Sequence, residues 1–420
     1  FTNANIGVDP LLGPLANNGG PTHTHLPAAT SVARNNGVDA SGSITDQRGF
    51  IRISGGFCDI GSVEMTEFVV VNTNNSGVDS LRQAVLNANA ALTPEAIITF
   101  SPANFTMSKI IILTSGELAV TRGVTVLGPA VGVTVSGNGA SRIFNINGTG
   151  VFDVSISDLS LVNGNASGNG GAILLQDERL TLTNVTISQC TASNGGGLYS
   201  EGGGSITLEN TLISANFATS AQGGGIGVHA VGSPAVIIRG STFFANSSTT
   251  GGGGLAINAA AGVLIENTSF HSNSGPVGGI SFGSGVTGSG GLTIRNTTLS
   301  GNSSPSGSGA ILSSSPGVLN VLNSTIADNS GGTGVGGILI NNISGTLALE
   351  STIVSGNTGT TAADARRLSG TLSVKNSAIG VSPLGGFTDL GSNIAFGTDL
   401  KLGTLADHGG GFFTHLPAVD

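Results

Sequence analysis

The chain has 420 residues, 70 of them glycine, and a formal net charge of −9. Its 38% hydrophobic and 9% charged residues exclude simple disorder, since disordered chains combine low hydrophobicity with high charge, and the glycines lack the three-residue period of collagen. No apolar run reaches the roughly 18 residues that a membrane-spanning helix needs, and an acidic chain without a basic block is a poor partner for nucleic acid.

The N-terminal segment is predicted to be a tail, because the other end of the chain repeats its beginning. Residues 9–28 match residues 399–418 without a gap at a constant offset of 390, and over positions 1–28, 14 of 28 residues are identical. Two diverged copies indicate a tandem array. Residues 1–66 are then the tail of a preceding repeat unit, a linking or capping segment, and residues 391–420 begin a second copy. We expect the parent protein to be much longer than this chain.

Five residues of the two tails are candidates for capping a rod or joining units. His25 and His415 occupy the same Thr-His-Leu-Pro turn in the two copies, so we expect each imidazole to bond within its turn. Asp46, Arg48 and Arg52 are expected to pair and close the segment, a role that we favour over catalysis. Cys58 lies in the same tail; two cysteines are too few for a disulfide framework, and whether Cys58 pairs with Cys190 stays open.

Residues 67–96 are predicted to form an initial strand and a capping helix. Asp79 or Ser80 can cap the N-terminus of a helix in which Leu81, Val85 and Ala88 share one face. The first coil of a solenoid exposes unpaired strand edges and core. An amphipathic helix laid across that end protects both.

Residues 97–390 are predicted to be a parallel β-helix. Strand patterns start loosely and become a regular repeat in which glycine-rich anchors precede an apolar residue; the six intervals between Ile173 and Ile338 give a mean period of 27.5 residues. Period-2 alternation within each repeat, as at 292–296, indicates strands. Several short strands per period are typical of one β-helix coil, so we expect an all-β solenoid of about ten coils, stacked ~4.8 Å apart.

Two columns of asparagines recur in step with this period, and both are predicted to point inward and form amide ladders. The first column, in which Cys190 takes one place as a small buried thiol, comprises Asn216, Asn246, Asn273, Asn302, Asn329 and Asn357. The second column ends the alternating strand and comprises Asn210, Asn267, Asn296, Asn323 and Asn376. Several glycosylation sequons fall at the second column, where an inward side chain would exclude a glycan. The glycine pairs at the opposite corner are expected to adopt positive φ and to let neighbouring backbones approach closely.

Polysaccharide lyases and hydrolases also use parallel β-helices, and they need clustered carboxylates for calcium or for acid–base chemistry. The carboxylates of this chain are scattered. Glu209 and Glu266 take equivalent places in neighbouring repeats, but Arg239 lies between them and Arg295 follows, so the alternating signs favour cross-coil ion pairs. We therefore expect no catalytic residue, no metal and no cofactor.

The histidines and serines add no catalytic candidate. His229 and His271 each stand alone in the sequence. No Gly-x-Ser-x-Gly motif occurs on a strand, a turn and a helix, and no acid–base partner for a serine is visible.

Several segments resemble bacterial secreted right-handed β-helix proteins of the choice-of-anchor Q type. The start of that family is similar to residues 75–85, 97–100 and 113–118. Its end is similar to residues 9–15, 18–22, 45–49 and 58–61. The resemblance implies a large, secreted, surface-associated protein whose unit ends just before an anchoring signal, whereas in this chain another unit begins after Glu64. A weaker similarity, in the Gly-Gly-Ala-Ile and Phe-x-x-Asn motifs, is to repeats of chlamydial polymorphic outer-membrane adhesins.

The interpretation that we favour is a structural extracellular protein, a right-handed β-helical unit of a long surface fibre joined head to tail. Its partners would be further repeats of the same chain, and its location extracellular or at the cell surface, without membrane insertion. The first alternative is an adhesin that binds glycans or host surfaces along a face rich in Ser, Thr and Asn. The second is a polysaccharide lyase or hydrolase.

Overall fold

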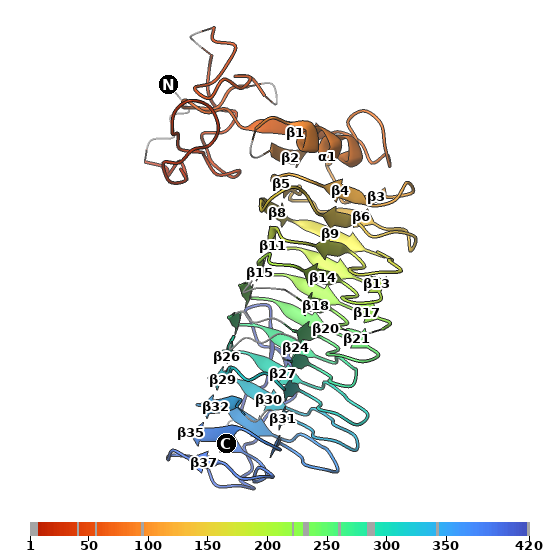
Figure 1. Cartoon of the computed structure of the whole chain (residues 1–420), viewed down its shortest axis with the longest axis vertical. Coiled ribbons are helices and arrows are strands. Elements are labelled where there is room, and N and C mark those ends of the chain that lie inside the picture. The colour runs from red at the N-terminus through yellow and green to blue at the C-terminus, as the bar shows by residue number, and fades with distance from the viewer. Residues whose placement is uncertain are drawn as a thin grey trace.

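The computed structural model describes residues 7–39, 42–54, 57–93, 96–220, 222–229, 235–258, 262–283, 290–341 and 344–417. These residues form a long rod of stacked coils, with an irregular N-terminal segment beside its first coil (Figure 1). Asn3 and Ala418, which belong to the matching tails, lie outside the described residues.

The rod begins with the strand and the helix expected at its N-terminal end. Strand β1 (Thr66–Val70) pairs in parallel with β2 (Ala96–Phe100), and helix α1 (Leu81–Ala90) contacts both strands. The Ser80 side chain accepts a hydrogen bond from the Gln83 backbone N–H, which confirms one of the two expected N-caps. The residues that α1 buries are Leu81, Ala84, Val85 and Ala88. The helix therefore covers the top of the core.

Three long parallel sheets run the length of the rod, and the coils between its two ends contribute one strand to each sheet. The first sheet continues from β1 and β2 through β5 (Val124–Leu127), β8 (Asp153–Ser157), β11 (Arg179–Thr183), β15 (Ile206–Glu209), β19 (Val236–Arg239), β23 (Val263–Glu266), β26 (Leu292–Arg295), β29 (Val318–Leu322), β32 (Thr346–Glu350), β35 (Thr371–Lys375) and β37 (Thr388–Asp389). The second sheet contains β4 (Leu118–Val120), β7 (Phe144–Ile146), β10 (Ile173–Leu175), β14 (Leu198–Glu201), β18 (Ile226–His229), β22 (Leu255–Ile257), β25 (Ile280–Phe282), β28 (Ile311–Ser313), β31 (Ile338–Ile340) and β34 (Ala365–Arg367).

The third sheet has eleven strands, so the rod has about eleven coils where the repeat period predicts about ten. It contains β3 (Lys109–Ile112), β6 (Val133–Ser136), β9 (Leu159–Val162), β12 (Thr186–Ser188), β16 (Leu212–Ser214), β20 (Thr242–Phe244), β24 (Ser269–His271), β27 (Thr298–Ser300), β30 (Thr325–Ala327), β33 (Ile353–Ser355) and β36 (Ala378–Ile379). A short additional sheet contains β13 (Thr191–Ala192), β17 (Phe217–Ala218) and β21 (Ser247–Ser248). Near the C-terminus, β38 (Ala406–Asp407) and β39 (Phe413–Thr414) form an antiparallel pair.

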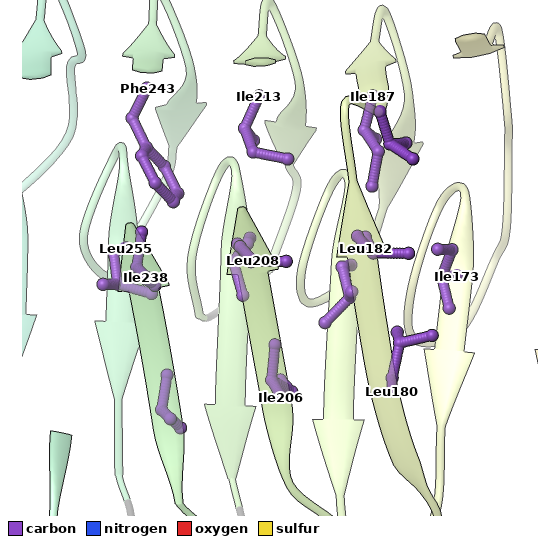
Figure 2. Packing of buried hydrophobic residues seen from close by; sticks show 14 of the residues in the cluster. Ile173, Leu180, Leu182, Ile187, Ile206, Leu208, Ile213, Ile238, Phe243 and Leu255 are labelled. Carbon is purple, nitrogen blue, oxygen red and sulfur yellow. The ribbon is translucent and has the colours of Figure 1, made fainter. Parts of the chain in front are cut away.

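The core consists of apolar columns, because equivalent residues of successive coils lie above one another. Leu182, Leu208 and Ile238 are register partners in the first sheet, and each is at most 1% exposed (Figure 2). In the third sheet the rings of Phe243 and Phe270 stack with centroids 4.4 Å apart. Full burial of one such side chain stabilises the fold by about 1.5–3 kcal/mol. The alternating pattern thus forms a continuous hydrophobic core along the rod.

The glycine pairs allow close approach between coils, as expected, but most of them do not adopt the predicted positive φ; Gly170, at 67°, is an exception. A Cβ atom added to Gly224 would lie 2.2 Å from the carbonyl oxygen of Ser247 and 2.4 Å from that of Gly253. Gly224 and Gly225 do not adopt positive φ; the preceding Gly223 does, at 65°. The pair is glycine because the adjacent coil leaves no room for a side chain, and the left-handed turn falls one residue earlier.

Candidate interaction surface

The first asparagine column forms the predicted amide ladder inside the rod. Asn216 Nδ2 donates to Asn246 Oδ1 at 3.0 Å and to the Ile187 carbonyl at 2.9 Å, and the Asn216 backbone N–H donates to the same Oδ1 at 3.1 Å. The same contacts continue along the column, whose members are at most 4% exposed, through Asn273, Asn302 and Asn329 to Asn357. Both amide hydrogens and the carbonyl oxygen of each rung are used, so the ladder is structural.

Each end of the ladder has a different terminal residue. At the N-terminal end the Cys190 backbone N–H donates to Asn216 Oδ1 at 3.0 Å, and burial raises the pKa of the Cys190 thiol to about 12. At the C-terminal end Asp364 Oδ1 accepts from Asn357 Nδ2 at 2.9 Å, and burial raises the pKa of Asp364. Cys190 and Cys58 are both buried and free, so they do not pair.

The second asparagine column is exposed, and the prediction that it forms an inward ladder is wrong. All of its members adopt positive φ, between 46° and 51°, which Asn tolerates better than most residues: Asn210, Asn267, Asn296, Asn323 and Asn376. Their exposure also removes the steric argument against glycans at the sequons of Asn267, Asn296 and Asn323.

The residue after each of these asparagines points inward instead, and it is a serine or a threonine. Ser324 Oγ donates to the Leu322 carbonyl at 2.7 Å and accepts from the Thr297 backbone N–H at 3.2 Å. Related contacts join other hydroxyls of this second ladder, namely Thr211, Ser241, Thr268, Thr352 and Ser377. The recurring Asn-Ser or Asn-Thr dipeptide was the signal that could have revealed it.

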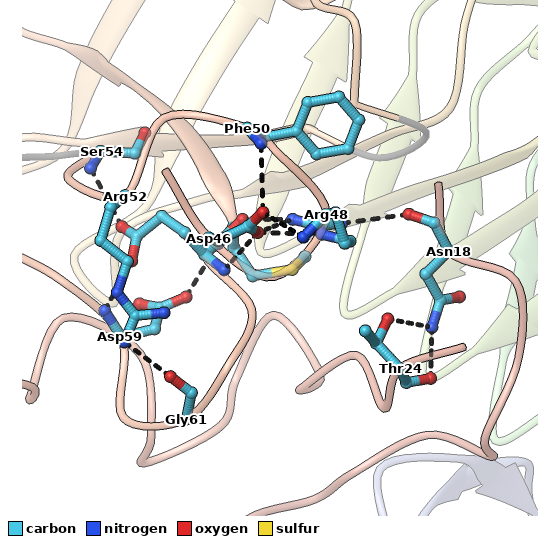
Figure 3. A network of polar contacts seen from close by, with 11 residues as sticks. Asn18, Thr24, Asp46, Arg48, Phe50, Arg52, Ser54, Asp59 and Gly61 are labelled. Atoms are coloured by element: carbon cyan, nitrogen blue, oxygen red, sulfur yellow. Dashed lines mark hydrogen bonds and ion pairs between the residues drawn. The ribbon is translucent and has the colours of Figure 1, made fainter. Parts of the chain in front are cut away.

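Residues 29–65, here called the connector, are closed by a buried ion pair. Arg48 and Asp46 lie 2.9 Å apart, with side chains 2% and 0% exposed (Figure 3). Arg48 Nη2 also donates to the Glu64 carbonyl at 2.6 Å, and Asp46 Oδ2 accepts from the Glu64 backbone N–H at 3.0 Å. Arg52 does not join this pair and donates to the Gly61 carbonyl at 2.6 Å. Cys58 is buried in the same segment.

Two further carboxylates hold the loops of the connector together. Glu64 accepts from the backbone N–H groups of Ser54 at 3.0 Å and of Asp59 at 2.7 Å, and burial raises the pKa of Glu64 to about 7. Asp59 accepts from the backbone N–H groups of Asn35 at 2.7 Å and Met65 at 2.9 Å. Burial also raises the pKa of Asp59. These buried acceptors give an irregular segment a defined shape.

Glu67 of β1 fastens the connector to the first coil of the rod. It accepts from Arg34 Nη2 at 2.9 Å and from Asn35 Nδ2 at 2.6 Å, both in the connector. It also accepts from Thr99 Oγ1, on β2, at 2.6 Å. One carboxylate therefore joins the connector to two strands of the rod that follows it.

The repeated tail sequence folds into the same hairpin at both ends of the chain. We call residues 9–28 the N-terminal hairpin and residues 399–417 the C-terminal hairpin. Each hairpin has an antiparallel bridge between a leucine and a proline at equivalent positions. The Nδ1 atom of His25 lies 2.7 Å from the Gly13 carbonyl oxygen, and that of His415 lies 2.7 Å from the Gly403 carbonyl oxygen. The prediction that each imidazole bonds within its own Thr-His-Leu-Pro turn is wrong, because the bond crosses the hairpin to a carbonyl on the facing strand.

The C-terminal hairpin packs against the side of the rod. Beyond β37 the chain turns back along the coils (Figure 1). His415 Nε2 lies 2.8 Å from Ser300 Oγ and 3.9 Å from Asp328 Oδ2, and the imidazole of His415 is buried. We call the outward side chains of β16, β20, β24, β27 and β30, with Asp328, the flank. Phe413 lines a groove with Leu212 of the flank.

His271 does not stand alone, contrary to the expectation from its sequence context. Its ring centroid lies 4.7 Å from that of Phe244 on the neighbouring coil and 4.6 Å from that of Phe413 in the hairpin. Burial lowers the pKa of His271, which favours the neutral imidazole in this three-ring stack. The stack joins residues that are far apart in the sequence, so no local sequence pattern predicts it.

The predicted charge column lies along the first sheet. Glu266 lies 2.7 Å from Arg295 and 3.4 Å from Arg239, which is 3.8 Å from Glu209. The hydrogen bond from Arg295 is the main cause that lowers the pKa of Glu266. Within the described ranges, no group of three or more His, Cys, Asp or Glu side chains is placed to hold a metal ion. In that part of the chain, no helix is long and apolar enough to cross a membrane.

The match to a family model agrees with this architecture. A family model described as "Right handed beta helix region" matches residues 185–379. Together with the fold, this match defines a right-handed β-helix repeat protein. Among solved structures, the chain is similar to "Geobacillus virus E2 - ORF18" at 9% identity and a TM-score of 0.41, over 75% of this chain and 62% of that chain, less than two thirds of its length. No curated protein sequence matches the chain.

Proposed function

We propose that the chain is a structural β-helical unit of a long extracellular fibre at a cell surface, with units joined head to tail. The observation that carries the proposal is the recurrence of one hairpin at both ends of a single rod, at an offset of 390 residues. The connector that follows the N-terminal hairpin is bonded to the next rod through Glu67. Repetition of this arrangement extends a filament, because a head-to-tail contact that does not close continues without limit.

The polar chemistry of the rod supports a mechanical role. The asparagine ladder and the hydroxyl ladder satisfy buried donors and acceptors at two corners of the coils. The apolar columns of the three sheets are continuous between these corners. In the described residues, such satisfied bonds and close packing hold the coils together against a protease, which suits a protein exposed outside the cell.

The proposal includes no catalytic residue, metal or cofactor. Glu209 and Glu266, the best candidates for acid–base chemistry, are engaged by Arg239 and Arg295. An ionised carboxylate held between two guanidinium groups is a poor proton donor. The lyase or hydrolase alternative would require release of products from polyuronides that disappears in Glu209→Gln or Glu266→Gln.

The adhesin alternative is favoured by a specific observation, the exposed asparagine column. Asn267, Asn296 and Asn323 present amides on successive coils, roughly 4.8 Å apart. A glycan array would detect a sugar ligand, and loss of binding in Asn267→Gly and Asn296→Gly would favour this role over the fibre.

Negative-stain electron microscopy of the native material tests the proposed fibre. We expect filaments built from rods of several tens of ångströms, and a denaturing mass well above that of this chain. Dispersed single rods at high protein concentration would contradict the proposal.

A further inference from the structure

The two hairpins have the same sequence pattern and the same backbone bonds, yet they bury different side chains. Leu12 and Leu15 of the N-terminal hairpin are 53% and 59% exposed, and His25 is also exposed. The equivalent residues of the C-terminal hairpin are more buried, and His415 is only 7% exposed. This difference marks the residues that face the rod in the docked copy. We call Leu12, Leu15, His23 and His25, with their C-terminal equivalents, the rod-facing residues.

A second set of residues changes in the opposite direction. Thr24 and Pro27 are buried in the N-terminal hairpin, whereas the equivalent Thr414 and Pro417 are more exposed. The connector packs on this side of the N-terminal hairpin: Arg48 Nη1 donates to the Asn18 carbonyl at 3.3 Å, and Thr24 and Pro27 line one groove with the connector residue Ile60. Each copy therefore shows one half of what the hairpin can contact. The C-terminal copy shows contact with a rod, and the N-terminal copy shows contact with a connector.

The rod-facing residues of the N-terminal hairpin lie open beside the connector. Leu12, Leu15 and His25 line one groove with Ile60 and Val63. Ile60 is 52% exposed, so the groove has an apolar wall on the connector side as well. The N-terminal hairpin therefore leaves exposed the same side chains that the C-terminal hairpin places against the flank of the rod.

We infer that the N-terminal hairpin docks, through Leu12, Leu15 and His25, on the flank of a second β-helical unit of the same kind. His25 Nε2 then takes the place that His415 Nε2 occupies against Ser300 and Asp328. The inference rests on the proposed function for the identity of the partner, which in a chain of repeats is the preceding unit. It deepens that function by placing the joint on the side of a rod, beside β16–β30, and not on its end.

The two hairpins differ at one rod-facing position. His23 stands where the C-terminal hairpin has Phe413, whose ring stacks on His271. A phenyl ring is larger and more apolar than an imidazole, so it buries more apolar surface against the ring of His271. The substitution His23→Phe reproduces the docked copy and should tighten the contact.

The test uses the full chain, in which the C-terminal hairpin occupies the flank. The double variant Leu405→Asp, Phe413→Asp releases that hairpin. Sedimentation velocity should then show a concentration-dependent shift from monomer to dimers and longer species, because the N-terminal hairpin of another copy docks on the vacated flank. When His23→Phe is added to this double variant, dimers should form at a lower protein concentration. When Leu12→Asp and Leu15→Asp are added to the double variant instead, the protein should remain a monomer.

A matched control is Val38→Asp, which places the same charge on a connector residue that is 88% exposed and should not alter association. Circular dichroism and the thermal midpoint show whether each variant is folded. A released variant that remains monomeric, or association that persists after Leu12→Asp and Leu15→Asp, overturns the inference. If native filaments are seen but the variants give such a result, the proposed fibre is supported and the docking of the hairpin on the flank is wrong. If native rods are single but association depends on the hairpin, the docking is supported and the proposed fibre is wrong.

Discussion

The Nε2 atom of His415 lies 2.8 Å from the Oγ atom of Ser300, a residue 115 positions earlier in the chain. Both groups are buried, and the Nδ1 atom of the same ring is bonded within the hairpin to the Gly403 carbonyl. The imidazole therefore connects the fold of the hairpin to its position on the flank. A histidine is suited to this because its two ring nitrogens bond in different directions.

The substitution His415→Ala should loosen the C-terminal hairpin without unfolding the rod. Loss of a hydrogen bond with a buried partner costs roughly 1–3 kcal/mol. Hydrogen exchange measured by mass spectrometry should show faster exchange in residues 399–417, with β27 of the rod still protected. His25→Ala is the matched control and should not alter that segment; unchanged exchange in His415→Ala would contradict the docking contact.

Acidification should weaken docking of the same hairpin. Burial lowers the pKa of His271 below its ordinary value of 6.5, so the docked state binds fewer protons than the released state. The contribution of His271 to docking is then fully present above pH 6.5 and is lost as the pH falls through the lowered pKa of this group. Limited proteolysis of residues 399–417 across this range measures the effect. His271→Phe keeps the ring stack and should abolish the pH dependence; a variant that still opens in acid would assign the effect to another group.

The substitution Asn273→Ala should destabilise the rod much more than a change at an exposed asparagine. It leaves Asn246 Nδ2, the Asn246 backbone N–H and the Phe243 carbonyl without their partner, at a cost on the order of 3 kcal/mol. The control Asn267→Gly keeps the positive φ of an exposed corner and should alter stability by about 0.5 kcal/mol or less. Urea unfolding midpoints compare the two variants, and equal shifts would refute the structural ladder.

The connector should lose stability as the pH rises from about 4.5 to about 7. Burial raises the pKa of Glu64 from 4.5 to about 7, so in this window the folded connector retains a proton that the unfolded segment releases. The loss is at most about 1.4 kcal/mol per pH unit. Hydrogen exchange of the connector at several pH values measures it, and Glu64→Gln should flatten the dependence. Glu350→Gln, at an exposed ion pair, is the control that should leave the slope unchanged.

N-linked glycans should be attached only at sequons whose asparagine side chain is exposed. Asn296 and Asn302 both begin an Asn-x-Ser/Thr sequence, but Asn296 is exposed whereas Asn302 is 0% exposed in the ladder. When the chain is secreted by a host that attaches N-linked glycans, the folded product should carry a glycan on Asn296 and none on Asn302. Mass spectrometry of glycopeptides reads both sites, and a folded product modified at Asn302 would contradict the ladder.

The periodic features could be predicted from the sequence because each coil repeats the same pattern of apolar and polar residues. Alternation within a strand places Leu208 inside, and a constant spacing puts Asn216 above its neighbours, so the solenoid and its amide ladder follow from the pattern. Which side chain points inward at the corner after the first-sheet strand could not be predicted in the same way. Asn267 and Thr268 are adjacent, and a left-handed φ at the asparagine decides that the threonine points inward.

The stacked coils, the capping helix and the recurrence of the tail sequence could thus be predicted, since they depend on local propensity and on spacing. The hairpin fold of the tail, its place on the rod and the burial of its side chains depend on tertiary contacts. Contacts such as that of Phe413 with His271 join segments about 140 residues apart, and no periodic pattern encodes them. They follow from the shape of the assembled rod, which exists only once all of its coils have packed.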